Sequence, residues 1–391
     1  MSRLTTVRAR RIALLATFAL AVAACGGGGS KTSSNGGGGG AVTIGFFGEL
    51  TGPDAQLGIN PYDGIKLAVA QHNKKSGAKK ITLVPYDSQG SATQAPQLAE
   101  KVISDKTVAV IGPVFSGESQ AADPIFQQAG IPNVTCSATQ VALASHGWTY
   151  WHRAVGNDGN QGPAAAKYIV KKLGTKNVAV VDDNETYSLG IADIVRSMLP
   201  TLGAKVAVSD HIDKTAQDYS ATVNQVKAAN PDAIFYGGYY SEGGRFLKQL
   251  RDAGITVKWV SDDGAADQKL VASAGVPAAE GAFTTNVSGD VTKNPNAGTF
   301  VSDYKALNNA DPGTYSAECY DVANMILQAV DQGKTTSKDI NDWLATNSYT
   351  GITATIKFGS NGEVTNPVIY LYEVKNGTLT YDGTVDQLVG S

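Results

Sequence analysis

The strongest constraint on the fold is the stretch from Val108 to Thr139, where two short apolar runs are each followed by small hydroxyl residues. The first run, 108–111, has four apolar residues without alternation, which predicts a strand buried on both faces. A helical pattern follows from Ser116 and ends at Gly130, and a second strand is predicted over 131–135. Strand, helix and strand in succession predict parallel strands in an α/β sheet, whose carboxyl edge is where ligands bind.

Hydroxyl side chains follow both of these strands. Ser116 comes after the first, and Ser137-Ala138-Thr139 comes after the second. Hydroxyls and unpaired backbone N–H groups at one sheet edge suit a small carboxylate, and the helix N-terminus at Ser116 favours an anion. The alternative is that these small residues only form the turn from strand to helix.

The same alternation of strand and helix patterns runs along most of the chain. It begins with an apolar strand at 42–47, and Asn60-Pro61 is expected to open the first helix, because proline suits the first helical position. It restarts after Gly156-Asn157, so the patterns predict two successive α/β units, which 391 residues can supply. The part of the chain after Asn286 has three helical patterns, followed by a hairpin turn predicted at Asn376-Gly377. The final strand of this hairpin is expected to return to a sheet.

The N-terminal segment predicts export and a lipid anchor. Residues 1–24 combine a positive start with an apolar run too short to span a bilayer, and they lead directly to Cys25. This arrangement resembles a bacterial lipobox, in which Cys25 becomes the lipidated first residue; an ordinary signal peptide is the alternative. Residues 25–40 predict a flexible Gly/Ser-rich tether. Export through the Sec or the twin-arginine route stays open.

Composition and motifs exclude several classes of function. The net charge of −3 offers no basic footprint for nucleic acid. The four histidines are scattered, with no metal-ligand spacing, and neither a P-loop nor a dinucleotide-binding glycine motif occurs. We therefore expect no metal, no cofactor and no enzyme activity. In an oxidising compartment, Cys136 and Cys319 either form a disulfide or remain two buried thiols.

Polar and aromatic residues also follow the predicted strands of the second unit. Tyr187, Tyr239 and Asp263 stand just past three strand ends. A free amino acid bound between the two units would place its carboxylate at the hydroxyls and its ammonium at Asp263. Each such charge-assisted hydrogen bond is worth roughly 1.5–3 kcal/mol. Taken singly, Asp263 is equally well explained as a turn residue and the tyrosines as half-buried rim residues.

Three strings of residues carry a resemblance to a known family. They are GFFGELTGP at Gly45–Pro53, QGPAAAKYI at Gln161–Ile169, and YGGY at Tyr236–Tyr239 followed by RDAG at Arg251–Gly254. They resemble the periplasmic leucine/isoleucine/valine-binding proteins of ABC transporters, over nearly the whole chain from 42 to about 379. The resemblance implies a type I periplasmic binding protein fold, with two lobes joined by three crossovers and each lobe a mainly parallel sheet flanked by helices.

The resemblance also implies lobe boundaries that differ from two successive units. It places residues 41–157 and 287–366 in lobe 1, and residues 158–286 and 367–391 in lobe 2.

By the same resemblance, individual residues acquire roles. Ser116 and Thr139 hold the carboxylate of an amino acid. The carbonyl of Ser137 and the side chain of Asp263 hold its ammonium. The other predicted ligand-binding residues surround the ligand: Leu57, Phe115, Ala138, Tyr187, Tyr239 and Tyr315.

Four positions depart from the family pattern, so the resemblance does not identify the side chain of the ligand. Leu57 replaces a tyrosine that lines the pocket in several relatives, and Phe115 stands where a smaller residue is common. Asp263 replaces a glutamate of some relatives, and Tyr315 stands where an apolar aromatic residue can line the pocket. One methylene changes preference by only about 1–3 kcal/mol, so leucine, isoleucine and valine are not separated from phenylalanine or other small apolar ligands.

The resemblance therefore implies an extracytoplasmic, membrane-anchored solute-binding lipoprotein. It would capture a branched-chain or similar apolar amino acid and deliver it to an ABC transporter permease, and we expect it to be a monomer. The alternatives are a ligand-sensing receptor module of the same fold, or a binding protein for a urea-like amide or an aromatic acid. The balance between open and closed forms also stays open.

Overall fold

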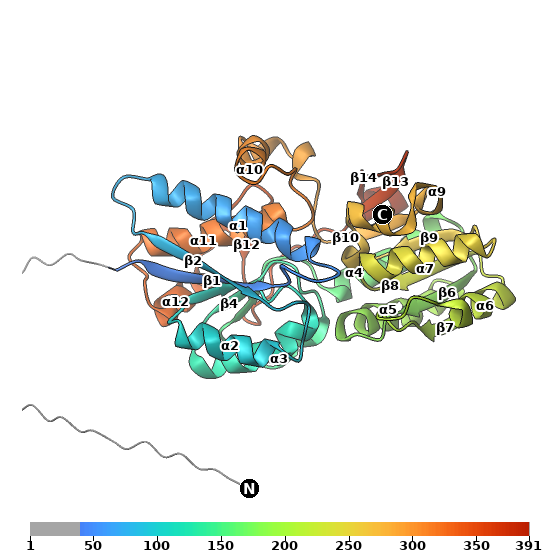
Figure 1. Cartoon of the computed structure of the whole chain (residues 1–391), viewed down its shortest axis with the longest axis horizontal. Helices are drawn as coiled ribbons and strands as arrows, with labels where there is room; N and C mark the ends of the chain where they lie inside the picture. Colours follow the sequence, from blue (N-terminus) through green and yellow to red (C-terminus); the bar gives the residue numbers. More distant parts are fainter. Residues whose placement is uncertain (1–39, 391) are drawn as a thin grey trace, which may run out of the picture. The chain divides into compact units, whose positions relative to one another are not determined.

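Two sheets, each flanked by helices, organise residues 40–390, which the computed structural model describes (Figure 1). The predicted signal peptide, Cys25 and all but the last residue of the predicted tether lie outside these residues. None of the helices in the described part is both long enough and apolar enough to cross a membrane.

The first sheet has five strands in the order β2-β1-β3-β4-β5, and every neighbouring pair is parallel. Its strands come from the first part of the chain: β1 (Val42–Gly48), β2 (Ile81–Asp87), β3 (Ala109–Ile111), β4 (Asn133–Thr135) and β5 (Trp151–Arg153). The predicted strands at 108–111 and 131–135 are thus adjacent, and both end at the carboxyl edge.

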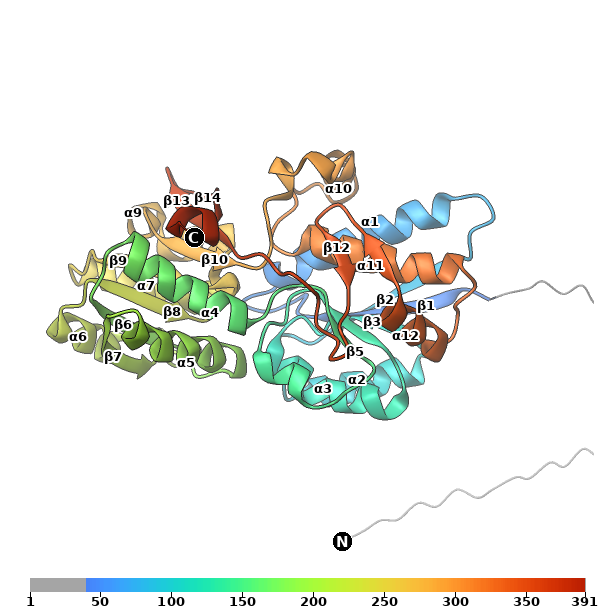
Figure 2. The ribbon, with the colours of Figure 1, turned by 180° about the vertical axis from the view of Figure 1, so that it is seen from behind.

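The helices around this sheet come from two separate parts of the chain. The first part supplies α1 (Gln56–Lys74), α2 (Ala95–Ser104) and α3 (Ser116–Ala129). The later part supplies α10 (Phe300–Asn308), α11 (Ser316–Asp331), α12 (Ser337–Thr346) and the hairpin β11 (Ser348–Thr350) and β12 (Thr355–Lys357). Helices α1 and α11 pack side by side (Figures 1 and 2). A Cβ added at Gly64 would lie 2.1 Å from the carbonyl oxygen of Ser316, so this contact requires glycine.

The second sheet has seven strands in the order β14-β13-β10-β9-β8-β6-β7. Five parallel strands form its main part: β6 (Asn177–Asp182), β7 (Lys205–His211), β8 (Ala233–Gly237), β9 (Lys258–Ser261) and β10 (Phe283–Asn286). The predicted hairpin is β13 (Tyr370–Lys375) and β14 (Thr378–Thr384), which joins the sheet antiparallel to β10.

Helices of the middle and final parts of the chain accompany this second sheet. They are α4 (Asp158–Lys167), α5 (Thr186–Thr201), α6 (Ser220–Ala229), α7 (Tyr240–Asp252), α8 (Gln268–Ala274), α9 (Val276–Ala279) and α13 (Val385–Val389).

The chain passes between the two sheets three times, after β5, after β10 and after β12 (Figure 2). The two-lobed α/β fold implied by the resemblance is confirmed. The expectation of two successive units is wrong, because α10, α11 and α12 return to the first sheet and the hairpin then joins the second. Apolar periodicity indicates that one face of a segment is buried, but it does not indicate on which sheet the segment packs. The predicted lobe boundaries stay a prediction.

The first helix also differs from its prediction. Helix α1 begins at Gln56, and Pro61 lies inside it. Proline lacks the N–H that would bond to the carbonyl of Leu57, which costs the helix one hydrogen bond. The turn before Pro61 is nevertheless helical, since the N–H of Leu57 donates to Asp54 O at 3.0 Å. This earlier start places the buried Leu57 in the first turn.

Candidate functional site

A small cavity between the two sheets collects every residue that the sequence predicted to contact a ligand. Its volume is about 10 Å³, roughly the space of one water molecule. The predicted residues that line it are Leu57, Phe115, Ser116, Ser137, Ala138, Thr139, Tyr187, Tyr239, Asp263 and Tyr315. Val114 and Gly264 also line the cavity and were not predicted, although each is the chain neighbour of a predicted residue.

The segment 137–139, which we call the hydroxyl loop, is held by Thr135 at the end of β4. The Thr135 hydroxyl accepts from the N–H groups of Ser137 at 3.3 Å and Ala138 at 2.9 Å, and it donates to Pro113 O. The Ser137 hydroxyl donates to Val114 O at 2.7 Å. This network ties the loop after β4 to the loop after β3.

Two further hydroxyls face the cavity from this side. Ser116 begins α3, and its Oγ accepts from the N–H of Gln140 at 3.2 Å. The Oγ1 atom of Thr139 is buried and makes no hydrogen bond of ordinary geometry within residues 40–390, although the Asp158 carboxyl lies close enough for this hydroxyl to lower its pKa. Buried polar atoms are almost always hydrogen-bonded, so this hydroxyl can bond either to Asp158 or to a polar group entering the cavity.

Asp263 lies at the opposite side of the cavity, at the start of a short 3₁₀ turn (Asp263–Ala265) that follows β9. Its carboxyl accepts from the hydroxyl of Tyr187 at 2.6 Å and from the hydroxyl of Tyr315. Burial raises the pKa of Asp263, and the two phenol hydrogen bonds oppose that shift. Among residues 40–390, Asp263 has no ion-pair partner, so the site holds a buried acid without a neighbouring cation.

Two more buried carboxyls lie near Asp263, and neither was predicted from the sequence. Burial, followed by the charge of Asp263, raises the pKa of Asp158 to about 8. The same two causes raise the pKa of Asp262, whose carboxyl accepts from the N–H of Gly238 at 3.1 Å. Asp158 stands at the start of α4 and Asp262 in a turn-like sequence, where acids are common, so nothing local indicated their burial.

Aromatic rings separate this cavity from a larger one. The rings of Phe115 and Tyr239 lie 4.8 Å apart between centroids, and those of Tyr187 and Tyr239 lie 5.5 Å apart. On their other side is a cavity of about 320 Å³, which the same three residues line together with charged side chains such as Lys214 and Arg245. A ligand in the small cavity would thus be covered by aromatic surface.

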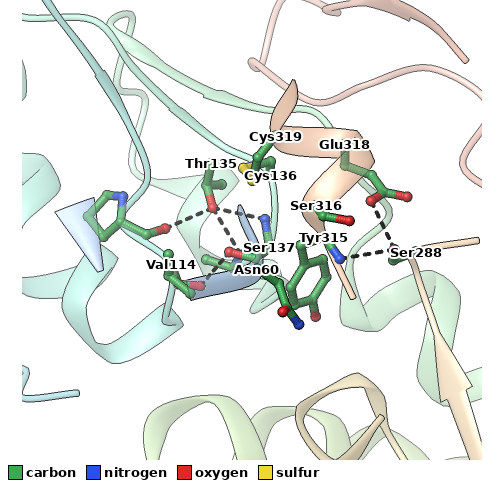
Figure 3. The surroundings of a disulfide bond; sticks show 12 residues. Asn60, Val114, Thr135, Cys136, Ser137, Ser288, Tyr315, Ser316, Glu318 and Cys319 are labelled. Atoms are coloured by element: carbon green, nitrogen blue, oxygen red, sulfur yellow. Dashed lines mark hydrogen bonds between the residues drawn. A yellow bond between two sulfur atoms is a disulfide. The ribbon is translucent and has the colours of Figure 1, made fainter. Parts of the chain in front are cut away.

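The structure decides between the two alternatives for the cysteines. Cys136 and Cys319 form a disulfide, with their Cα atoms 5.4 Å apart (Figure 3). Within residues 40–390, no group of three or more histidine, cysteine or acidic side chains is arranged to hold a metal ion.

Comparisons with known sequences point to one family. A family model described as a periplasmic binding protein matches residues 41–378. The leucine-, isoleucine-, valine-, threonine- and alanine-binding protein of Pseudomonas aeruginosa is 29% identical over 335 residues, covering 85% of this chain and 89% of that protein. The Leu/Ile/Val-binding protein of Escherichia coli K12 is 32% identical over 328 residues, covering 83% of this chain and 88% of that protein.

Comparisons with solved structures agree with the sequence matches. A leucine-binding protein of Thermotoga maritima aligns with a TM-score of 0.81 and 28% identity, over 88% of this chain and 98% of that one. The substrate-binding protein of a branched-chain amino acid transporter of Streptococcus pneumoniae, solved with isoleucine, also aligns with a TM-score of 0.81 and 28% identity, over 88% of this chain and 99% of that one.

Proposed function

This chain belongs to the family of periplasmic leucine/isoleucine/valine-binding proteins, and from that premise we propose that it binds a branched-chain or similar apolar amino acid between its lobes. The family predicted from the sequence is thereby confirmed. The protein would act outside the cytoplasm and hand its ligand to an ABC transporter permease, as a carrier without catalytic activity.

The observation that carries the proposal is the pairing of two complementary groups in one cavity. The hydroxyl of Thr139, which makes no hydrogen bond of ordinary geometry within residues 40–390, stands at one side and the buried carboxyl of Asp263 at the other. A free amino acid has a carboxylate that accepts hydrogen bonds and an ammonium that donates them. Its carboxylate would bind Ser116, Thr139 and the backbone of the hydroxyl loop, and its ammonium would bind Asp263.

The ammonium would also supply the positive charge that the buried carboxylate of Asp263 lacks. A buried carboxylate is stabilised when a cation lies beside it, which opposes the effect of burial on the pKa. In the described structure the hydroxyls of Tyr187 and Tyr315 occupy both oxygens of Asp263. Each carboxylate oxygen can accept a second hydrogen bond, so an incoming ammonium would bind Asp263 beside the two phenols, and the small cavity would widen as the lobes separate to admit the ligand.

The ligand class is supported by the relatives. The Pseudomonas aeruginosa protein is named for leucine, isoleucine, valine, threonine and alanine, and the Streptococcus pneumoniae structure holds isoleucine. These ligands share the amino-acid backbone and have small side chains. The aromatic wall formed by Phe115, Tyr187 and Tyr239 offers apolar contact to such a side chain.

The remaining parts of the proposal concern anchoring and lobe movement. Removal of residues 1–24 would leave Cys25 as the lipidated first residue, with the tether 25–40 linking it to the binding domain. Lobe 1 would comprise 41–157 and 287–366, and lobe 2 would comprise 158–286 and 367–391. The three connections between them would act as the hinge, and only ligand that contacts both lobes would favour the closed form.

The test is calorimetric titration of the protein, unfolded and refolded to remove ligand retained from expression, with the twenty amino acids, urea and benzoate. We expect leucine, isoleucine or valine to bind. Removing one partner of a buried charge pair costs ~2–5 kcal/mol, so Asp263→Ala should weaken binding roughly 30- to 5,000-fold. Asp252→Ala removes an exposed acid of the same lobe and serves as the control. Unchanged affinity in Asp263→Ala would refute the ammonium assignment, and binding of urea or benzoate alone would refute the ligand class.

A further inference from the structure

We propose that the Cys136–Cys319 disulfide is a positioning element of the ligand site, which fixes the hydroxyl loop against the helix start that presents Tyr315. This inference rests on the proposed function. It assigns the disulfide a role in ligand affinity in addition to its contribution to stability.

One end of the disulfide lies inside the hydroxyl network. Cys136 is flanked by Thr135, whose side chain holds the N–H groups of the loop, and by Ser137, whose hydroxyl bonds to Val114 O (Figure 3). Any displacement of Cys136 would move these groups and, with them, Thr139. The carboxylate side of the proposed site therefore depends on the position of this cysteine.

The other end lies in the first turn of α11. The N–H of Cys319 donates to Tyr315 O at 3.0 Å, and the N–H of Tyr315 donates to Ser288 Oγ at 3.1 Å. Ser288 in turn donates to the carboxyl of Glu318 at 2.9 Å (Figure 3). Since Ser288 follows β10 by two residues, this end of the disulfide is also joined to the second connection between the sheets.

Tyr315 needs such support, because its backbone is in a conformation that residues other than glycine rarely adopt. Its φ angle is +67°, in the left-handed region. Backbone strain of this kind persists only where the surrounding structure holds the residue in place. The constraint has a functional consequence here, since the hydroxyl of Tyr315 bonds to Asp263 across the cavity.

The disulfide has no substitute at this place in the described structure. Within residues 40–390, no hydrogen bond joins segment 135–139 directly to segment 315–319. The two cysteines are 183 residues apart in sequence, and both are buried. Without the bond, only packing contacts would keep the hydroxyl loop and the start of α11 in register.

The role can be measured because ligand binding and disulfide formation must be reciprocal. A dithiol reduces the bond by supplying two electrons and two protons, which yields two thiols and converts the dithiol to its own disulfide. If the oxidised protein binds ligand tenfold more tightly than the reduced protein, saturating ligand makes the bond harder to reduce by the same factor. For this two-electron couple, tenfold corresponds to about 30 mV.

The first experiment titrates isoleucine into the oxidised wild-type protein, the pair Cys136→Ala/Cys319→Ala, and Leu250→Ala. Leu250 is fully buried in the core of the second sheet, so Leu250→Ala lowers stability without touching the hydroxyl loop. We expect at least tenfold weaker binding in the cysteine pair and wild-type affinity in Leu250→Ala, with circular dichroism showing that each is folded. If the double alanine variant does not fold, the titration uses Cys136→Ala/Cys319→Val, which restores volume at the site.

The second experiment equilibrates the wild-type protein with reduced and oxidised dithiothreitol, with and without saturating isoleucine. We expect the midpoint of reduction to become at least 30 mV more negative with ligand, while circular dichroism shows that the reduced protein stays folded. A disulfide that serves stability alone would leave the affinity and the midpoint of the folded protein unchanged, which would overturn the inference. Failure of the oxidised wild-type protein to bind any amino acid would overturn the proposed function as well.

Discussion

We expect Asp158→Asn to make the ligand-free protein more stable, which is unusual for a change at a buried position. Asp158 begins α4 and is completely buried. Neither of its carboxyl oxygens makes a hydrogen bond of ordinary geometry within residues 40–390. Burial and the charge of Asp263 raise its pKa to about 8, and the nearby Thr139 hydroxyl and Arg153 guanidinium oppose them to a smaller extent.

The magnitude follows from the difference between the folded and the unfolded chain. Below pH 8 the folded protein keeps Asp158 protonated, whereas the unfolded chain releases that proton above the ordinary pKa of 3.8. The stability that this proton confers is complete below pH 3.8 and is lost as the pH rises through about 8. At about 1.4 kcal/mol per pH unit, the cost to the wild-type protein is about 2 kcal/mol at pH 5 and about 4 kcal/mol at pH 7. Asparagine has a similar shape and no such proton, so the variant avoids this cost.

The assay is urea unfolding of wild-type protein and Asp158→Asn at pH 5, 6 and 7, followed by far-ultraviolet circular dichroism. The advantage of the variant should grow by about 1.4 kcal/mol for each pH unit. Asp252→Asn removes the same charge at an exposed position and controls for net charge. A variant that is no more stable than wild type at pH 7, or that shares its dependence on pH, would show that Asp158 is ionised in the folded protein.

Two further changes test how the site is supported. The buried guanidinium of Arg153 binds Glu363 and two carbonyl groups of the loop after β4. Arg153→Leu should therefore lower the free energy of unfolding by ~3–5 kcal/mol. A loss below about 1 kcal/mol in urea unfolding would contradict this. Gly64→Ala should cost about 1–3 kcal/mol, because its Cβ would meet Ser316 O at 2.1 Å and push α1 away from α11. Gly190→Ala, whose Cβ would be 3.4 Å from its nearest neighbour, is the matched control, and an equal loss in both would refute the packing argument.

Strands with apolar sequences were predicted well, and a strand with a polar sequence was missed. The run at 108–111 contains β3 because its side chains are apolar on both faces. β10 reads Phe-Thr-Thr-Asn, which has no apolar pattern, although all four residues are buried. Its Thr285 hydroxyl donates to Ser261 O and accepts from the amide of Gln161. Those partners, distant in sequence, make burial of a polar strand possible, and no local pattern contains them.

At the candidate site, too, some residues could be predicted from local sequence and others could not. Hydroxyls after two strands and an acid after another were visible in the sequence, and the resemblance to a family added Leu57 and Tyr315. The acids Asp158 and Asp262 were missed, because an acid at a helix start or in a turn is usually exposed. Burial changes their chemistry, and burial is a property of the packed molecule.

The sequence by itself determined where the apolar strands and most of the helices form and which strand ends carry hydroxyl groups, because these follow from local periodicity and turn residues. Only the tertiary structure decided that α11 returns to the first sheet, that Tyr315 meets Asp263, and that Cys136 pairs with Cys319. The last two contacts join residues 52 and 183 positions apart. Local patterns specify that a surface is apolar or polar, whereas the partner that covers it is selected only when the whole chain packs.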